Sequence, residues 1–323
     1  MDSDGSGGIS QPEFEHAVQL IKLADLFNAR TISRITNDHP TATETTLSCV
    51  DYSPVRRHLQ RPIVALKEFM FEERPAWASV RWVCMEGIDQ LNIRRLAIKY
   101  RIHPLALEDV IQNERQRPKL EPYDSHMFLV LPLIPSVQTK AIQDLIREYT
   151  TSLYTSRGSL ESEESADTLL KQVGELQHIQ HEPQQLSLYI FEHTVISIHE
   201  GSDRFWEKMM LRMKQSYSKV RQNDATFLVY TLLDILVDDI SPVVLAYAAK
   251  LRILELLLHK SPSKFPVIEV QMVKRQVGGL LRTAFPLEKV IQQLLNLNTT
   301  SENFYLRDVH DHIVQIKEEC EGK

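Results

Sequence analysis

Residues 102–110 read IHPLALEDV, and residues 116–121 follow with QRPKLE. Pro104 suits the first turn of a helix, because its missing amide N–H leaves no hydrogen bond unmade there. The apolar residues after it recur at helical spacing and form a buried stripe, which leaves Glu108 and Asp109 pointing elsewhere. Two adjacent carboxylates away from the core are usually a solvated surface. These residues by themselves predict an amphipathic helix and leave the role of its carboxylates open.

Short apolar runs separated by turns surround this helix. Their length and their Val, Ile, Phe and Tyr content predict strands at 46–52, 63–66 with Phe69, 80–85, 127–133, 186–190 and 194–199. Helical stretches at 88–100 and 104–113 alternate with them. The fold class is therefore α/β (α+β), a mixed β-sheet layered with helices. Residues 150–168 are rich in Ser, Thr, Glu and Gly and predict an insertion loop over about 150–178.

After Gly201 the strand pattern gives way to long helical patterns, which we expect at 205–220, 224–259 and 267–297. Pro242 and Pro286 should kink or divide the second and third of them, because proline removes a helix hydrogen bond. A last helix begins near Asn303, and its apolar residues recur at spacings of four, three and four, as in a helix that packs against a partner. This pattern still runs at the end of the sequence, so we expect the full protein to continue.

The composition excludes several classes of protein. The 323 residues carry a net charge of −6, and no stretch combines dense Lys and Arg with aromatics, so we expect cations and no nucleic acid as partners. Cys49, Cys84 and Cys320 are too far apart for a zinc knuckle or a disulfide framework, which favours a reducing compartment. No secretory signal opens the chain. The most apolar window, 227–258, is interrupted by charges and does not read as a membrane span.

A separate motif, DSDGSGGISQPE, occupies residues 2–13. It matches the twelve-position calcium loop of an EF-hand, with oxygen side chains at positions 1, 3 and 5, glycine at 6, an apolar residue at 8 and glutamate at 12. The expected Ca²⁺ ligands are Asp2, Asp4, Ser6, the Gly8 carbonyl, Ser10 and a bidentate Glu13. A helix should follow over 14–27. The entering helix and a pairing loop are missing, so a remnant without calcium affinity is the alternative.

The block at 102–121 resembles the hallmark of the CorA-type magnesium/cobalt transporter family, in which such a helix start precedes QRPK and a strand. Trp82-Val83 with Gly87, and the stretches 228–239 and 303–316, resemble family positions in the same order. The resemblance covers roughly residues 46–323. It implies a homopentamer whose α/β domain carries two long antiparallel helices and the start of a stalk helix. The family's Gly-Met-Asn pore signature does not occur in this sequence.

The resemblance also implies sites. Acidic residues that match Glu108, Asp109, Asp234 and Asp308 contribute to Mg²⁺ or Co²⁺ sites in the family's cytosolic domain, the main one between neighbouring subunits. The residues agree with this, because Asp234 and Asp238 lie four apart on one helical face and repel unless a cation intervenes. A surface pair with Arg or Lys is the alternative for Asp234.

Together these observations predict a metal-sensing cytosolic region that gates a membrane-bound magnesium transporter. Its expected segments are a partial EF-hand at 1–29, a linker at 30–45, an α/β domain at 46–204, a helical hairpin at 205–300 and a stalk helix from 301. The alternative is a soluble calcium-responsive interaction protein built on a CorA-like scaffold. An enzyme is not expected: the run His310-Asp311-His312 suggests a metallohydrolase, but residues so close along a helix point apart, and no nucleotide cradle or nucleophile motif occurs.

Overall fold

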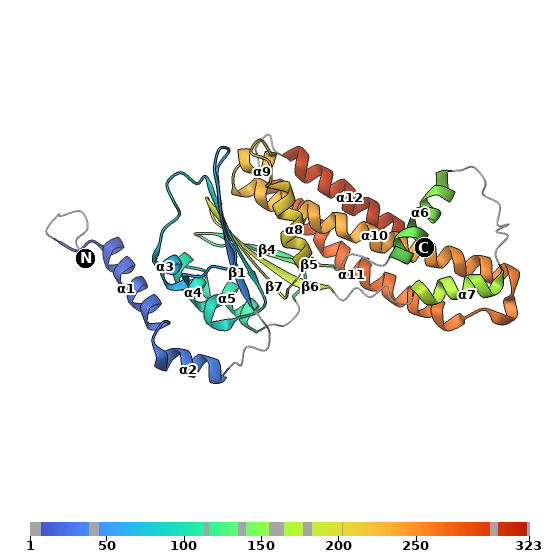
Figure 1. The fold of residues 1–323 in the computed structure, drawn as a ribbon, viewed down its shortest axis with the longest axis horizontal. Coiled ribbons are helices and arrows are strands. Elements are labelled where there is room, and N and C mark those ends of the chain that lie inside the picture. Colours follow the sequence, from blue (N-terminus) through green and yellow to red (C-terminus); the bar gives the residue numbers. More distant parts are fainter. Residues whose placement is uncertain are drawn as a thin grey trace. The chain divides into compact units, whose positions relative to one another are not determined.

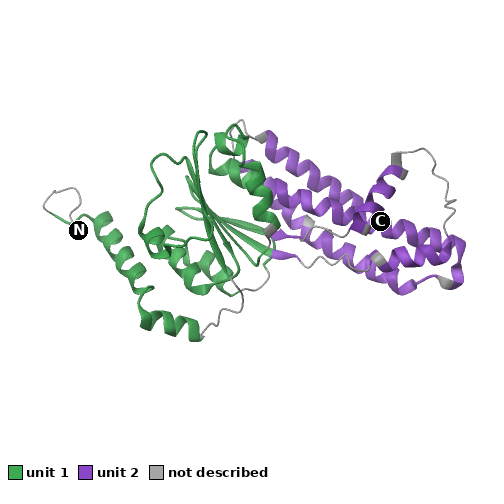
Figure 2. Ribbon diagram, in the orientation of Figure 1, with its two compact units in different colours: residues 1–131, 185–231 green, residues 132–184, 232–323 purple. Residues whose placement is uncertain are grey.

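The computed structural model describes residues 8–38, 45–112, 116–134, 140–154, 165–176, 183–201, 203–297 and 303–321. The chain divides into two compact units (Figure 2). Unit 1 holds residues 1–131 and 185–231, and unit 2 holds residues 132–184 and 232–323. Among the described residues, no helix combines the length and the apolar character that crossing a membrane requires.

A seven-stranded sheet forms the centre of unit 1, in the order β2-β1-β3-β7-β6-β5-β4 (Figure 1). Its strands are β1 Thr46–Tyr52, β2 Arg57–Gln60, β3 Val80–Glu86, β4 Lys119–Pro122, β5 Met127–Leu133, β6 Gln184–Ile190 and β7 Thr194–His199. β3 and β7 run parallel, while β1 pairs antiparallel with both β2 and β3, and β4–β5 and β6–β7 are also antiparallel. The sheet is therefore mixed, as the strand pattern predicts.

The helices of unit 1 are α1 Gln11–Asp25, α2 Ala29–Asp38, α3 Leu66–Phe71, α4 Gln90–Tyr100, α5 Pro104–Ile111, α8 Asp203–Arg212 and α9 Lys219–Gln222. One apolar core joins α1, α3, α4 and α5 to one face of the sheet. Its members include Leu23, Met70, Leu96, Phe128 and Ile196. On the opposite face, the Trp206 ring of α8 stacks on Trp82 of β3 with 4.9 Å between ring centroids. Both faces are covered, so the central strands are buried along their whole length.

Long helices make up most of unit 2. They are α6 Lys140–Tyr154, α7 Ala166–Glu175, α10 Ala225–Lys260 (which enters unit 2 at residue 232), α11 Val267–Leu297 and α12 Asn303–Glu321. The short 3-10 helix η2 Pro262–Lys264 joins α10 to α11. Pro242 and Pro286 do not divide their helices, which continue through both positions. The residues that follow them, Val243 and Leu287, are fully buried, and we infer that their packing outweighs the lost hydrogen bonds.

The four apolar residues that recur along α12 are all buried: Val309, Ile313, Ile316 and Cys320. α12 packs mainly on α11. This confirms that the seam faces a neighbouring helix, and here the neighbour belongs to the same chain.

Two local predictions in unit 1 were wrong. The apolar run at 63–66 with Phe69 is not a strand, because Phe69 and Met70 are buried on one side of the short helix α3. Short apolar runs fit either structure, and only packing separates them. Part of the expected linker is also helical: the Asn28 side chain accepts a hydrogen bond from the Arg30 amide at 3.0 Å, where α2 begins, and Ile32 is half-buried.

Two further helix boundaries differ from the prediction. The expected insertion loop contains α7, whose Leu169, Val173 and Leu176 follow one another at helical spacing and are buried. The Ser165 hydroxyl caps this helix by accepting a hydrogen bond from the Thr168 amide at 3.3 Å. Because the surrounding residues are mostly Ser and Glu, the average composition of this stretch predicted a loop although its apolar residues are spaced as in a helix. The helix expected over 205–220 ends at Arg212, with the separate turn α9 after it.

Candidate metal sites

Three potential metal ligands from two helices meet in unit 2. Asp234 comes from α10, and Asp308 and His312 come from α12. One oxygen of each carboxylate and one ring nitrogen of His312 all lie within 4.8 Å of one another. Asp234 is buried, whereas Asp308 and His312 are exposed. Carboxylate oxygens suit Mg²⁺, and an imidazole adds affinity for transition metals such as Co²⁺.

The cluster follows from the way each helix buries its apolar face. Asp234 lies between Leu233 and Ile235, which are both buried. On α12 the buried residues Val309 and Ile313 each follow a polar residue, so Asp308 and His312 border the seam one turn apart. The Asp308 Oδ1 and His312 Nε2 atoms are 4.0 Å apart. The seam that packs α12 therefore also sets the position of the two exposed ligands.

A small polar cavity adjoins this cluster through His312. Its volume is about 180 Å³, and it is lined by Val237, Asp238, Ser241, His312, Gln315, Ile316 and Glu319. Two of its lining residues, Asp238 and Glu319, add carboxylates beside the three clustered ligands. Mg²⁺ keeps several of its waters when it binds protein, so a cavity of this size can hold part of a hydrated ion.

The other two predicted ligands, Glu108 and Asp109, lie on α5 in unit 1. Lys119 Nζ donates to Asp109 Oδ2 at 2.7 Å and to Glu121 Oε1 at 2.9 Å. Glu108 Oε1 accepts a hydrogen bond from Gln112 Nε2 at 2.6 Å. One open surface depression is lined by Glu108, Asp109, Lys119 and Glu121. Asp109 thus has a cationic partner within its own chain.

Lys119 and Glu121 shift each other's ionisation. Partial burial acts to lower the pKa of Lys119, but its hydrogen bonds with Asp109 and Glu121 outweigh that effect and raise the pKa above its ordinary value. Burial acts to raise the pKa of Glu121, while hydrogen bonds from Lys119 and the Tyr123 hydroxyl bring it below its ordinary value. Lys119 and Glu121 are therefore both charged at neutral pH, and any cation that binds Asp109 has to compete with Lys119.

Comparison with known proteins identifies the family. A family model described as "CorA-like Mg2+ transporter protein" matches residues 77–160 and 161–321. The chain belongs to the CorA family. The hallmark at 102–121 lies within the matched region, and the resemblance read from it is confirmed. The match does not favour the calcium-responsive scaffold, and the family consists of transporters rather than enzymes.

Two curated relatives of this CorA-family chain are similar over most of its length. The cobalt/magnesium transport protein CorA of Thermotoga maritima is 26% identical over 245 residues, which are 74% of this chain and 59% of that protein. The putative metal ion transporter YfjQ of Bacillus subtilis is 23% identical over 246 residues, 75% of this chain and 63% of that protein. The chain thus spans about three fifths of the length of these relatives.

Solved structures agree on the fold. The soluble domain of CorA from Methanocaldococcus jannaschii aligns with a TM-score of 0.54 at 12% identity, covering 85% of this chain and 91% of that one. The full-length CmaX protein aligns with a TM-score of 0.57 at 14% identity, covering 85% and 72%. The cytoplasmic domain of ZntB from Vibrio parahaemolyticus aligns with a TM-score of 0.51 at 13% identity, covering 86% and 92%. The mixed sheet and long helices are therefore those of CorA-like soluble domains.

The N-terminal loop of this CorA-family chain is described only from Gly8 onward, so the predicted ligands Asp2, Asp4 and Ser6 lie outside the described residues. Ser10 and Glu13 form a capping box at the start of α1: the Ser10 amide and hydroxyl donate to Glu13 Oε2 at 3.0 and 2.8 Å. A helix cap explains this serine and glutamate without a metal. Calcium binding by the loop stays a prediction.

The neighbours of His312 on α12 do not join the cluster, as their helical spacing predicts. His310 Nε2 lies 3.2 Å from Gln292 Nε2, and the Asp311 side chain is 81% exposed. His312 itself was not among the predicted magnesium ligands. The available signal was its position four residues after Asp308, which places both side chains on one face of the helix.

Proposed function

We propose that this chain is the metal-sensing region of a CorA-type transporter. In this proposal Mg²⁺ or Co²⁺ binds at acidic sites between the subunits of a homopentamer and controls ion passage through a membrane pore in the rest of the protein. The observation that carries the proposal is the meeting of Asp234, Asp308 and His312 from two distant helices of one chain, in a cluster whose members Asp308 and His312 are exposed, where a neighbouring subunit can reach them.

Bridging of subunits by the ion supplies the response to magnesium. At high cytosolic magnesium, the ion neutralises the carboxylates and favours a closed ring. At low magnesium, no ion bridges the acidic residues of neighbouring subunits, the subunits separate and the pore opens. Because Mg²⁺ prefers few carboxylates and retains its waters, a sparse and partly exposed cluster suits a weak, reversible sensor.

Asp109 can take part although Lys119 binds it. The two side chains are 21% and 28% exposed, and an ion pair with such exposure contributes about 1 kcal/mol or less. A divalent cation delivered by a neighbouring subunit can displace the lysine at that cost. We therefore assign Glu108 and Asp109 to the face of one subunit that meets Asp308 of the next subunit. Lys119 pairs with Asp109 when magnesium is low.

Limited proteolysis of this chain over a magnesium series tests the proposal. Magnesium should slow cleavage of the wild-type chain, and Asp109→Ala combined with Asp308→Ala should abolish this protection. Asp311→Asn is the matched control, because Asp311 lies on the same exposed side of α12 outside the cluster. Equal protection of the wild type and the double variant would refute the assignment of these residues.

The loop at 2–13 adds a separate proposal, Ca²⁺ binding by Asp2, Asp4, Ser6, Gly8, Ser10 and Glu13. Calorimetric titration with calcium should show a saturable heat that Glu13→Gln removes, since this glutamate would supply two of the oxygens. No heat with the wild-type chain would leave Ser10 and Glu13 as a helix cap only.

A further inference from the structure

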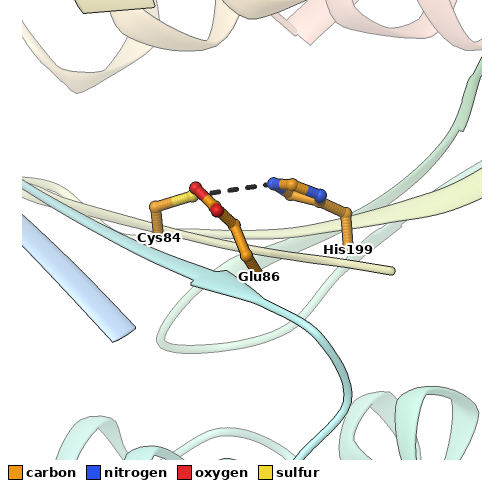
Figure 3. Close-up of side chains that lie close together, drawn as sticks. All are labelled: Cys84, Glu86 and His199. Atoms are coloured by element: carbon orange, nitrogen blue, oxygen red, sulfur yellow. Dashed lines mark hydrogen bonds between the residues drawn. The ribbon is translucent and has the colours of Figure 1, made fainter. Parts of the chain in front are cut away.

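A second cluster of metal-ligating side chains lies inside the sheet of unit 1. Cys84 and Glu86 are two residues apart on β3 and therefore project from the same face of that strand. His199 ends the neighbouring strand β7, which runs parallel to β3 and places His199 opposite Glu86 in the register. Figure 3 shows the three side chains converging. None of them belongs to the acidic sites described above.

The geometry of the cluster is close to that of a metal-binding set. The Cys84 Sγ and His199 Nε2 atoms are 3.7 Å apart, and one Glu86 oxygen lies within 4.8 Å of both. A tetrahedral Zn²⁺ with its usual bonds to sulfur and nitrogen would hold those two atoms about 3.6 Å apart. The observed separation therefore requires little movement to accept the ion.

Burial makes the cluster unusual. Cys84 and His199 are fully buried and Glu86 is 7% exposed. A carboxylate in a core is costly unless it is paired or coordinates a metal. Glu86 meets this condition through Arg61, so the case for an ion rests on the geometry of the three donors.

The surroundings hold the ligands in place. The Gly87 amide donates to the His199 carbonyl at 2.8 Å, which ties the ends of β3 and β7 together. The His199 ring meets the Phe205 ring edge-on at 5.5 Å. Ligands fixed on rigid strands and oriented by neighbouring groups need little reorganisation to bind an ion.

Arg61 occupies one side of Glu86 without closing the site. It donates two hydrogen bonds to the carboxylate, at 2.9 and 3.2 Å, and its guanidinium lies over the Trp206 ring. A carboxylate offers about four acceptor positions, so Glu86 can keep Arg61 and still turn one lone pair to a metal. Because the Arg61 side chain is 25% exposed, movement of this arginine gives an ion a path from solvent.

We propose that Cys84, Glu86 and His199 form a binding site for a borderline-soft divalent cation, Zn²⁺ or Co²⁺, separate from the magnesium sites. Sulfur and imidazole ligands select these ions and disfavour Mg²⁺, which takes oxygen ligands. Metal uptake releases the Cys84 thiol proton to solvent as the thiolate binds. The alternative is a thiol–imidazole contact that binds nothing.

Cobalt spectroscopy on the whole chain tests this site, because a thiolate bound to Co²⁺ gives a ligand-to-metal charge-transfer absorption in the near ultraviolet that oxygen and nitrogen ligands do not give. Co²⁺ is added in excess Mg²⁺, which fills the acidic sites, and zinc content is measured after dialysis. We expect the charge-transfer band and one zinc per chain. Cys84→Ser and His199→Gln should each weaken zinc binding by more than about 100-fold, which is a larger loss than is typical for residues that only hydrogen-bond to a metal ligand.

Cys49→Ser is the matched control. Cys49 is also buried, on the neighbouring strand β1, but it belongs to the apolar core on the other face of the sheet. This variant should keep the band and the zinc. Absence of the thiolate band in the wild type, or its survival in Cys84→Ser, would overturn the proposal. Absence of the band in the wild type decides against the proposal even if a core variant fails to fold, and its assignment to Cys84 rests on its loss in Cys84→Ser and its survival in Cys49→Ser and Cys320→Ser.

Discussion

Replacing Asp308 by asparagine separates the electrostatic role of the unit 2 cluster from its packing. The substitution removes the charge and keeps the shape of the side chain. Because the Asp308 side chain is 62% exposed, the change leaves the buried seam of α12 intact. Any effect on stability therefore reports on the charges of Asp234 and His312 and on bound ions.

The size of the effect follows from the separation of the ligands. Two carboxylate charges at 4.8 Å, the limit within which the ligand atoms of the cluster lie, repel by about 0.9 kcal/mol at the dielectric constant of water and by about 3.5 kcal/mol at an effective value of 20. Asp308 is exposed, so the lower figure is the better guide. Without divalent ions, Asp308→Asn should therefore stabilise the chain by about 1 kcal/mol, or raise Tm by about 1–2 °C for a chain of 323 residues.

Magnesium should reverse this order. At ten times its Kd, an ion that binds only the folded state adds about 1.4 kcal/mol to the wild-type chain. The variant loses this gain with its ligand. Thermal unfolding followed by circular dichroism, in EDTA and over a magnesium series, measures both effects, and Asp311→Asn controls for a lost charge on the same helix. A variant that is no more stable than the wild type in EDTA, and that gains as much from magnesium, would refute the reasoning.

Other predictions concern the framework of the two units. Asp51→Ala breaks the buried ion pair with Arg81 (2.7 Å, both side chains 4% exposed) and should lower the free energy of unfolding by about 3–5 kcal/mol in a urea titration. Glu15 belongs to an exposed ion pair, so Glu15→Ala should lower it by less than about 1 kcal/mol. Equal losses in the two variants would contradict this prediction. Burial, helped by nearby Arg81, lowers the pKa of Lys99 from 10.5 to about 8, so the unfolded state binds more protons between these values and stability rises with pH there. Lys99→Met should remove that rise from urea midpoints measured across the window, and an unchanged slope would count against it. Leu169→Ala in α7 should destabilise the chain by about 2–5 kcal/mol, and a loss below about 1 kcal/mol would show that α7 does not pack as described.

Elements that depend on long periodic patterns were predicted well from the sequence. α10, α11 and α12 begin and end within one or two residues of the expected positions where those were given, because a 3.6-residue period sustained over 19 to 36 residues leaves little choice. The five longer strands were found for a similar reason, since their β-branched and aromatic content agrees with burial along nearly their whole length.

Short elements were harder, because their structure depends on packing partners far along the chain. The six residues of α3 carry too short a pattern to separate helix from strand. The ten residues of α7 were masked by polar neighbours, although the spacing of Leu169, Val173 and Leu176 contained the signal.

The candidate sites show the same division between residue type and spatial arrangement. The acidic residues could be named from the family resemblance, but the approach of His312 to Asp234 depends on how α10 and α12 are rotated against each other. The meeting of Cys84, Glu86 and His199 depends on the parallel register of β3 and β7, which join residues 115 positions apart. The spacing of the cysteines excluded a zinc knuckle, but it could not show that Cys84 meets Glu86 and His199 in the folded sheet.

Isothermal titration of the chain with magnesium, with its mass measured by light scattering before and after, tests the metal-sensing proposal most directly. We predict a saturable heat and a shift toward a larger assembly, both lost when Asp234→Asn and Asp308→Asn are combined and both kept in Asp311→Asn. A heat and a mass that the double variant leaves unchanged, or no heat at all with the wild-type chain, would contradict it.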